Sequence, residues 1–315
     1  MPLNPLADPN CPRCHGEGFN FTGEAFAPTQ GDRCDCLLRG RAQRYAKLRL
    51  VAARIPPKFT GASIEGFHIR NESIVVYDEE RGQAMQRNLG IFDKANRDAV
   101  ADLCAKPLPP GLTVFLKGPN GTGKTFLGNA LLTSQILLHG KTGLFIKATR
   151  YFPAILPEGA TPAEQRALKK LVRDVDVLLI DDLGAEKRSL FSRRELVDLI
   201  DDRWSAERPT IITSNESLRE VLGVASEEPE AGTEEHELWA HGMRIISRLG
   251  DLVIRIDWPP ETPDYRGVGN REENEERKSA YRHSKAAAFD DSDRLAAERA
   301  RARFGGKPGD GEEDF

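Results

Sequence analysis

The segment from Gly118 to Thr125 has the residue types and spacing of a loop that binds phosphate groups. Its glycines let the backbone wrap closely around phosphate oxygens with the N–H groups pointing inward, and the helical run that follows adds its positive N-terminal end. Lys124 is expected to contact the β- and γ-phosphates of ATP, and Thr125 to offer its hydroxyl to Mg²⁺. Nucleotide binding without hydrolysis is the main alternative. The predicted nucleotide ligands in the loop are Gly118, Pro119, Asn120, Gly121, Thr122, Gly123, Lys124 and Thr125.

Two adjacent acids, Asp181 and Asp182, follow the apolar run VDVLLI that begins at residue 175. A strand carrying them beside the phosphate loop would bring both carboxylates next to the metal. We predict that Asp181 binds Mg²⁺ and that Asp182 orients or activates the attacking water, although Glu usually has this second role. A strand end capped by acids without a metal is the alternative.

Three further polar residues could complete a hydrolytic site. Asn215 ends the strand-like run PTIITSN, where a core strand would meet the γ-phosphate. Arg244 and Arg248 lie four residues apart in the helical run 241–249, so they share one face of that helix and could reach across a subunit boundary. A solvated basic face is the alternative interpretation of the two arginines.

Four of the five cysteines fall within residues 11–36, as the pairs CPRC and CDC. In a reducing compartment such clustering favours a metal over disulfides, and four thiolates suit a structural Zn²⁺ ion. We predict zinc ligation by Cys11, Cys14, Cys34 and Cys36, with His15 as a less favoured replacement ligand. A redox CxxC motif is the alternative, but it leaves the second pair unexplained.

The short apolar runs alternate with helical patterns, which indicates an α/β fold with a five-stranded parallel sheet and flanking helices. The predicted domains are a zinc-binding module (1–40), a basic connector (41–59), an ATPase domain (60–266) and a disordered charged tail (267–315), in which 293–304 could form a transient helix. The predicted strands are Leu112–Leu116, Leu144–Lys147, Val175–Ile180, Thr210–Thr213 and Leu252–Ile256.

Two basic segments could contact DNA. The connector and its surroundings have no acid between Asp35 and Glu65, so DNA phosphate or an acidic protein surface could bind there, with a solvated linker as the alternative. A second basic segment, 169–173, has Tyr151 and Phe152 nearby, which could stack on single-stranded DNA or belong to the core.

The overall charge is nearly balanced, with 45 Lys and Arg against 49 Asp and Glu. It gives no global argument for a nucleic-acid or membrane partner. The N-terminus lacks the basic start and apolar stretch of a secretory signal, and no run of about 18 apolar residues occurs. We therefore expect a cytoplasmic protein without a membrane partner.

The phosphate loop, IDDLG, PTIITSN and RIISRLGD occur in this order, and with them the chain resembles the AAA+ ATPases over residues 60–266. That family includes DnaC-type helicase loaders and IstB-type transposition helpers. The resemblance implies that Asn215 is sensor 1, Arg248 an arginine finger and Arg266, in PDYR, sensor 2. Two features depart from the family: the acidic stretch 226–237 looks inserted, and no helical lid is evident.

The resemblance implies two functions that the sequence does not separate. The first is a helicase loader that binds single-stranded DNA and grips a hexameric replicative helicase through the zinc module. The second is a transposition helper whose ATP-bound oligomer coats duplex DNA and recruits a transposase. A zinc-stabilised adaptor that holds nucleotide without turnover is a third possibility, which the two acids and Arg248 disfavour. Both ATPase hypotheses imply ATP-dependent self-association.

Overall fold

A five-stranded parallel sheet in the order β6-β7-β8-β5-β9 forms the centre of the computed structural model. The structure describes residues 5–20, 32–78, 83–156, 160–185, 189–224 and 227–264. The predicted α/β fold with five parallel strands is confirmed. Its strands are β5 (Thr113–Lys117), β6 (Gly143–Lys147), β7 (Val177–Leu183), β8 (Thr210–Ser214) and β9 (Val253–Asp257).

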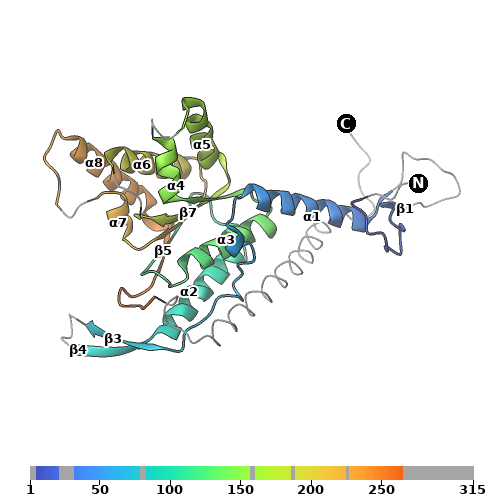
Figure 1. Ribbon diagram of the computed structural model, residues 1–315, viewed down its shortest axis with the longest axis horizontal. Coiled ribbons are helices and arrows are strands. Elements are labelled where there is room, and N and C mark those ends of the chain that lie inside the picture. The colour runs from blue at the N-terminus through green and yellow to red at the C-terminus, as the bar shows by residue number, and fades with distance from the viewer. Residues whose placement is uncertain are drawn as a thin grey trace.

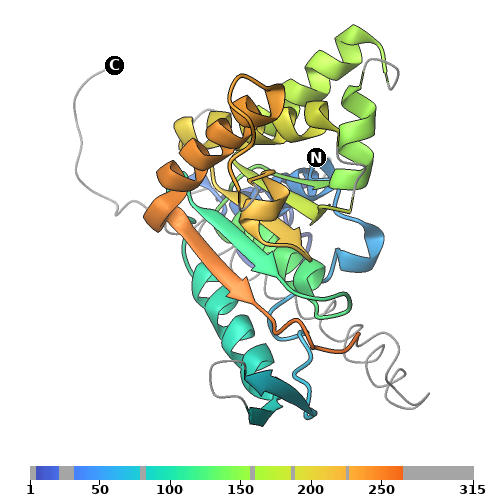
Figure 2. The same cartoon turned by 90° about the vertical axis from the view of Figure 1, so that its left-hand side faces the viewer.

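Both faces of this sheet are covered, which is why its strands are apolar on both sides. Along β5, Phe115 packs into one buried cluster, while Val114 and Leu116 pack into the other. Along β7, Leu178 and Leu179 alternate in the same way. Helices α4 to α8 lie over one face, and α2 and α3 over the other (Figure 2).

The helices begin at well-defined caps. The Thr161 hydroxyl accepts from the Glu164 backbone N–H, and the Glu164 carboxylate accepts from the Thr161 N–H, so α5 starts with a capping box. Thr233 caps α8, whose first turn contains three glutamates of the acidic stretch and thus matches the positive end of the helix dipole. The helices are α2 (Leu89–Cys104), α3 (Lys124–Leu137), α4 (Ala148–Ile155), α5 (Pro162–Asp174), α6 (Leu190–Ser205), α7 (Leu218–Val221) and α8 (Glu234–Leu249), with the 3-10 turns η1 (Pro57–Phe59) and η2 (Gly250–Leu252).

A β-hairpin that the sequence analysis did not predict projects from the domain below α2 (Figure 1). Its antiparallel strands are β3 (Ser73–Asp78) and β4 (Gln83–Asn88), which pair only with each other among the described strands. The base of the hairpin is fixed by a buried ion pair, in which Arg70 binds Asp93 of α2, and the Trp258 indole N–H donates to the same carboxylate at 2.9 Å. The hairpin is thus anchored to the end of the central sheet.

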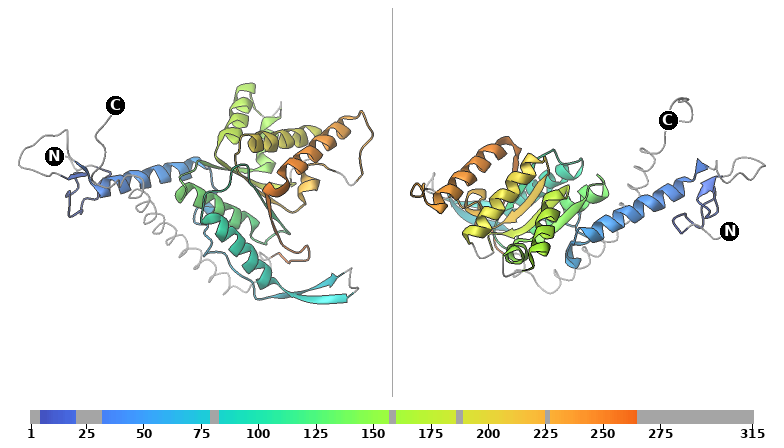
Figure 3. Two further views of the ribbon diagram at one scale, coloured as in Figure 1. Left: turned by 180° about the vertical axis from the view of Figure 1, so that it is seen from behind. Right: turned by 90° about the horizontal axis from the view of Figure 1, so that it is seen from above.

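Helix α1 (Asp35–Ala52) extends away from the domain that contains the central sheet and has the N-terminal module at its far end (Figures 1 and 3). That module contains the short antiparallel pair β1 (Phe19–Asn20) and β2 (Asp32–Arg33). At the other end of α1, Ala53 is buried and its carbonyl accepts from the Phe145 N–H of β6 at 2.7 Å. Much of the predicted basic connector is therefore a helix joined to the edge of the sheet.

Three sequence predictions fall outside the described residues. These are sensor 2 at Arg266, the tail 267–315 and the possible helix 293–304. In the part of the chain that is described, no helix has the length and apolar character needed to cross a membrane.

A fully buried arginine joins three elements at the amino ends of the strands, whereas the phosphate loop lies at their carboxyl ends. Arg203 of α6 is 1% exposed, and its guanidinium donates to the carbonyls of Val172, Val175, Asp176 and Pro209 and to the Thr210 hydroxyl. Burial lowers the pKa of this arginine to about 9. The side chain thereby donates to backbone carbonyls before β7 and β8 that are buried and cannot hydrogen-bond to water.

Replacing this arginine should therefore be costly. We expect Arg203→Met to lower the free energy of unfolding by at least about 3 kcal/mol, because the variant leaves buried carbonyls without donors. Urea unfolding followed by circular dichroism measures the change. The control Arg208→Met removes a partly exposed arginine nearby and should cost about 1 kcal/mol or less. Equal losses in the two variants would contradict this role of Arg203.

Candidate nucleotide-binding site and cysteine cluster

The phosphate loop has a left-handed backbone at two of its glycines. Gly121 has a φ of 76° and Gly123 a φ of 91°. A Cβ atom on Gly123 would lie 2.5 Å from Cε2 of Phe67, so both conformation and space require glycine there. This backbone turns the chain from the end of β5 into the first turn of α3, where N–H groups can face a phosphate.

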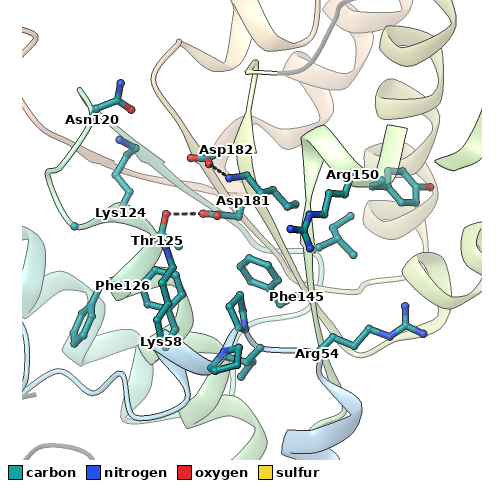
Figure 4. Close-up of a pocket in the computed structure, with 18 of the residues that line it drawn as sticks. Arg54, Lys58, Asn120, Lys124, Thr125, Phe126, Phe145, Arg150, Asp181 and Asp182 are labelled. Carbon is teal, nitrogen blue, oxygen red and sulfur yellow. Dashed lines mark hydrogen bonds and ion pairs between the residues drawn. The ribbon is translucent and has the colours of Figure 1, made fainter. Parts of the chain in front are cut away.

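Lys124 is folded over the same loop. Its ammonium donates to the carbonyls of Gly118 and Pro119, at 2.7 Å each, and the residue is 6% exposed. Figure 4 shows Lys124 beside Asn120 at the loop. A buried cation at this place suits the β- and γ-phosphates of a nucleotide, because phosphate oxygens are stronger acceptors than neutral carbonyls, and the contact of Lys124 with them stays a prediction.

Asp181 is the buried centre of the site. The hydroxyls of Thr125 and Thr213 both donate to its Oδ1, at 2.7 and 2.8 Å, and the residue is 4% exposed. Burial raises the pKa of Asp181, although the two hydroxyls oppose that shift. A threonine hydroxyl and a carboxylate side by side are oxygen ligands of the kind that Mg²⁺ takes (Figure 4), so the residues fit this ion.

Asp182 is presented by an irregularity in its strand. The pairing of β7 with β8 shifts register between Ile180 and Leu183, and Asp182 has a φ of 55°, which is unusual for a residue other than glycine. Its backbone N–H donates to the Thr213 hydroxyl at 3.0 Å. Its carboxylate forms a 2.8 Å ion pair with Lys147 of β6, drawn as a dashed line in Figure 4. Bulges of this kind occur next to active sites because they re-aim a side chain.

Asn215 lies at the end of β8, and its side-chain amide donates to Asn120 Oδ1 of the phosphate loop at 3.2 Å. The strand order explains this contact, because β8 lies next to β5, which leads into the loop. The structure thus brings Asn215 to the loop, and its role as a sensor stays a prediction.

A cavity of about 1010 Å³ lies beside the loop. Besides the predicted residues, residues 54–59 between α1 and the domain line it, together with Phe145 and Arg150. Figure 4 shows Arg54 and Arg150 on the side of the cavity away from Lys124 and Asn120. This side of the cavity could not be predicted from the sequence, because only the fold brings the segment after α1 to the phosphate loop.

Thr213 and Lys147 were also missed by the sequence analysis. Lys147 is paired in register with Asp181, and Thr213 lies two residues before Asn215 on β8. Both residues lie near strand ends, which is a sign of a possible site residue. That sign points to Asp181 and Asp182 only once β6 and β8 are known to flank β7.

Arg248 does not line this cavity. It lies in the last turn of α8, where its Nη1 is 2.5 Å from Asp201 Oδ1 and its guanidinium lies 5.7 Å from the centre of the Trp204 ring. A finger that acted within its own subunit would have to line the cavity, so the finger role of Arg248 stays a prediction that requires a neighbouring subunit. Arg244, one turn earlier, is exposed.

The hypothesis that Tyr151 and Phe152 stack on DNA bases is wrong. The two residues are 3% and 1% exposed and belong to the core under α4. Of the nearby cations, Lys169 and Arg173 pair with Glu195 of α6. The aromatic character of this segment is therefore explained by packing.

The four N-terminal cysteines converge in one buried cluster. Their sulfur atoms all lie within 4.8 Å of one another, and the pairs Cys11–Cys34 and Cys14–Cys36 are 3.6 and 3.3 Å apart. A tetrahedral zinc site with Zn–S bonds of about 2.3 Å has sulfur atoms about 3.8 Å apart, so the cluster fits Zn²⁺. His15 is exposed and does not belong to the cluster.

The backbone around the cluster supports this arrangement. The His15 N–H donates to the Cys11 carbonyl and the Glu17 N–H to the Cys14 carbonyl, both at 2.9 Å, which turns the first pair sharply. Cys34 occupies the N-cap position of α1, and Cys36 lies in the first turn of this helix. Backbone N–H groups of Arg13 and Cys14 lower the pKa of Cys11 to about 6, whereas burial raises that of Cys36 to about 12.

The fold and this site are those of a P-loop nucleotide-binding domain that resembles the AAA+ ATPases, and the chain also contains a four-cysteine cluster that fits zinc. Residues 111–228 match the family of IstB-like ATP binding proteins. The resemblance to AAA+ ATPases of the DnaC and IstB type is therefore confirmed over this part of the chain.

Two relatives represent the two functional branches. The replicative helicase loader DnaC of Escherichia coli (strain K12) is 30% identical over 115 residues, which are 36% of this chain and 46% of that protein. The insertion sequence IS1162 putative ATP-binding protein of Pseudomonas fluorescens is 34% identical over 101 residues, 32% of this chain and 42% of that protein. The chain thus spans about half the length of the curated relatives it matches.

Solved structures with a similar chain path include DnaI, with a TM-score of 0.47 and 19% identity over 65% of this chain and 94% of that one. The DnaC helicase loader has a TM-score of 0.45 and 20% identity, over 65% of this chain and all of that one.

The cysteine cluster predicts one zinc ion per chain. Gently purified protein should contain about one equivalent by mass spectrometry of the metal, and Cys34→Ser with Cys36→Ser should lose it, because two thiolates cannot hold a structural site. Chelation should unfold the N-terminal module but leave nucleotide binding intact, since the module has its own cluster. Zinc retained by the double variant, or nucleotide affinity lost on chelation, would contradict this assignment.

Proposed function

We propose that the protein hydrolyses ATP and that its activity serves to load a replicative helicase onto single-stranded DNA. The observation that supports hydrolysis is the placement of Lys124, Thr125, Asp181 and Asp182 around one cavity. Lys124 binds phosphate, and Thr125 with Asp181 holds Mg²⁺. The ion, when bound, offsets negative charge on the β- and γ-phosphates.

Asp182 is the candidate for orienting water, with Asn215 as a second polar group at the γ-phosphate. In the structure its carboxylate is paired with Lys147, and both side chains are about 40% exposed, at 38% and 41%. Ion pairs of this exposure contribute about 0–1 kcal/mol, so the contact does not prevent Asp182 from turning toward bound nucleotide.

Two substitutions should separate binding from chemistry. Lys124→Ala should weaken ATP binding at least about tenfold, because a charge-assisted contact to phosphate is lost. Asp182→Asn should keep the affinity and lower kcat about 100-fold, because the amide is not a base. Binding of a fluorescent ATP analogue and steady-state phosphate release measure the two effects. Normal hydrolysis by Asp182→Asn would assign the water-orienting role to another group.

Arg248 is proposed to complete the site of a neighbouring subunit in an ATP-dependent oligomer. It is partly exposed at the C-terminal end of α8, outside its own cavity. A guanidinium supplied in trans would offset charge on the transferred phosphoryl group and make hydrolysis depend on assembly.

A mixing experiment tests the finger. Arg248→Ala should bind ATP normally and hydrolyse it up to about 10³-fold more slowly. Lys124→Ala has an intact finger and Arg248→Ala an intact phosphate loop, so mixing the two inactive variants should restore part of the activity through mixed interfaces. Phosphate release is measured as the ratio of the variants changes. Co-assembly without any recovery would contradict action in trans.

The choice of a helicase as partner is supported by the N-terminal module. Helix α1 presents the cysteine cluster away from the nucleotide domain (Figure 1), as a module that grips another protein requires. The similarity to the replicative helicase loader DnaC agrees with this role.

The second candidate function is that of an ATPase that assists a transposase. It is favoured by the match to IstB-like ATP binding proteins and by the similarity to an insertion-sequence protein. In this case duplex DNA and a transposase replace single-stranded DNA and the helicase as partners.

Affinity capture from the native cell with ATP present distinguishes the two functions. We expect the full chain to recover a hexameric helicase, and the Cys34→Ser, Cys36→Ser variant to recover much less of it. Arg208→Met is the matched control, because it changes neither the cluster nor the nucleotide site. Recovery of a transposase in place of the helicase would establish the second candidate instead.

A further inference from the structure

We propose that Asp201 of α6 is a positioning residue for Arg248, which it holds in place to act on the neighbouring subunit. The inference rests on the proposed trans-acting role of Arg248. Asp201 Oδ1 lies 2.5 Å from Arg248 Nη1, and Trp204, also on α6, places its ring 5.7 Å below the guanidinium. Asp201 therefore fixes one nitrogen of the Arg248 guanidinium, and the Trp204 ring supports the face of that group.

Helices α6 and α8 both pack into the hydrophobic core, so the backbones that carry Asp201 and Arg248 are fixed relative to each other. On α8, Ile245 and Leu249 are 1% exposed, and on α6 Leu199 and Ile200 are buried in the same cluster. Gly242 allows close packing, because a Cβ there would lie 2.7 Å from a methyl carbon of Val224. The Arg248 side chain is thus the movable part, and Asp201 restrains it.

The pair differs from an ordinary surface ion pair in its surroundings. The Asp201 side chain is 25% exposed, while that of the neighbouring Asp202 is 55% exposed. His241, two turns before Arg248, lies 3.9 Å from Asp201 and 3.7 Å from Asp198, so one acidic row of α6 faces the basic side of α8. Within the described residues Arg244 has no ion pair, which makes Arg248 the arginine of this helix that is held.

Positioning predicts an effect on rate rather than on binding. A long arginine side chain loses conformational freedom when it is fixed before the subunits meet, so less has to be ordered in the transition state. Removing the restraint should leave the nucleotide site of the same subunit unchanged, because neither Asp201 nor Arg248 lines its cavity. The loss should appear in the neighbouring site.

The test is a double-substitution cycle on the full chain. Asp201→Asn should lower kcat about 10- to 100-fold with KM for ATP unchanged, whereas in the Arg248→Ala background it should have no further effect. Asp201→Glu should recover part of the rate. Asp202→Asn, next to it on α6, is the control and should keep the wild-type kcat. Thermal unfolding is measured for each variant to compare their folding.

Subunit mixing gives a second readout that does not depend on the cycle. Asp201→Asn has an intact phosphate loop and Lys124→Ala an intact, positioned finger, so the mixture should recover activity above the sum of its parts. No recovery despite co-assembly, an equal loss of kcat in the Arg248→Ala background, or a raised kcat in Asp201→Asn would each overturn the proposal. A wild-type rate for Arg248→Ala would instead refute the finger itself.

Discussion

The nucleotide site depends on the hydrogen bonds that the buried carboxylate of Asp181 accepts. This residue of β7 accepts from the hydroxyls of Thr125 at the start of α3 and Thr213 on β8, so one acid joins the phosphate-loop helix to two neighbouring strands. A carboxylate without water must be hydrogen-bonded or bind a cation, which gives this position little freedom to change. The same Thr213 hydroxyl accepts from the Asp182 N–H, so the irregular end of β7 is fixed by the strand beside it.

The two ends of α1 are stabilised by different means. At one end Ala53 joins the core of the sheet through the backbone of Phe145, and at the other end Cys34 and Cys36 belong to the cysteine cluster. Because a small module lacks a hydrophobic core, a metal ion bound by this cluster would hold its shape. The helix between them is a spacer whose length, rather than a large interface, sets the position of the module.

In the proposed oligomer, assembly would unite parts of the site that one chain keeps apart. The phosphate loop and its acids lie at the carboxyl ends of the strands, whereas Arg248 lies at the outer edge of α8, supported by Asp201 and Trp204. Residues 54–59 line the other side of the cavity, and they directly follow the helix that leads to the cysteine cluster.

The sequence by itself determined the phosphate loop, the acidic strand end, the pairs of cysteines that cluster and all five core strands, because each is a local pattern with a direct physical cause. Glycines at Gly121 and Gly123 and the apolar run before Asp181 need no knowledge of distant residues. The tertiary structure alone decided what meets across the sheet. Thr213, Lys147 and Asp201 are polar residues of ordinary appearance, and they matter only because the strand order and the packing of α6 against α8 place them beside Asp181, Asp182 and Arg248. Burial also decided against Tyr151 and Phe152 as DNA contacts, since an aromatic pair looks the same in sequence whether the fold covers it or leaves it in water.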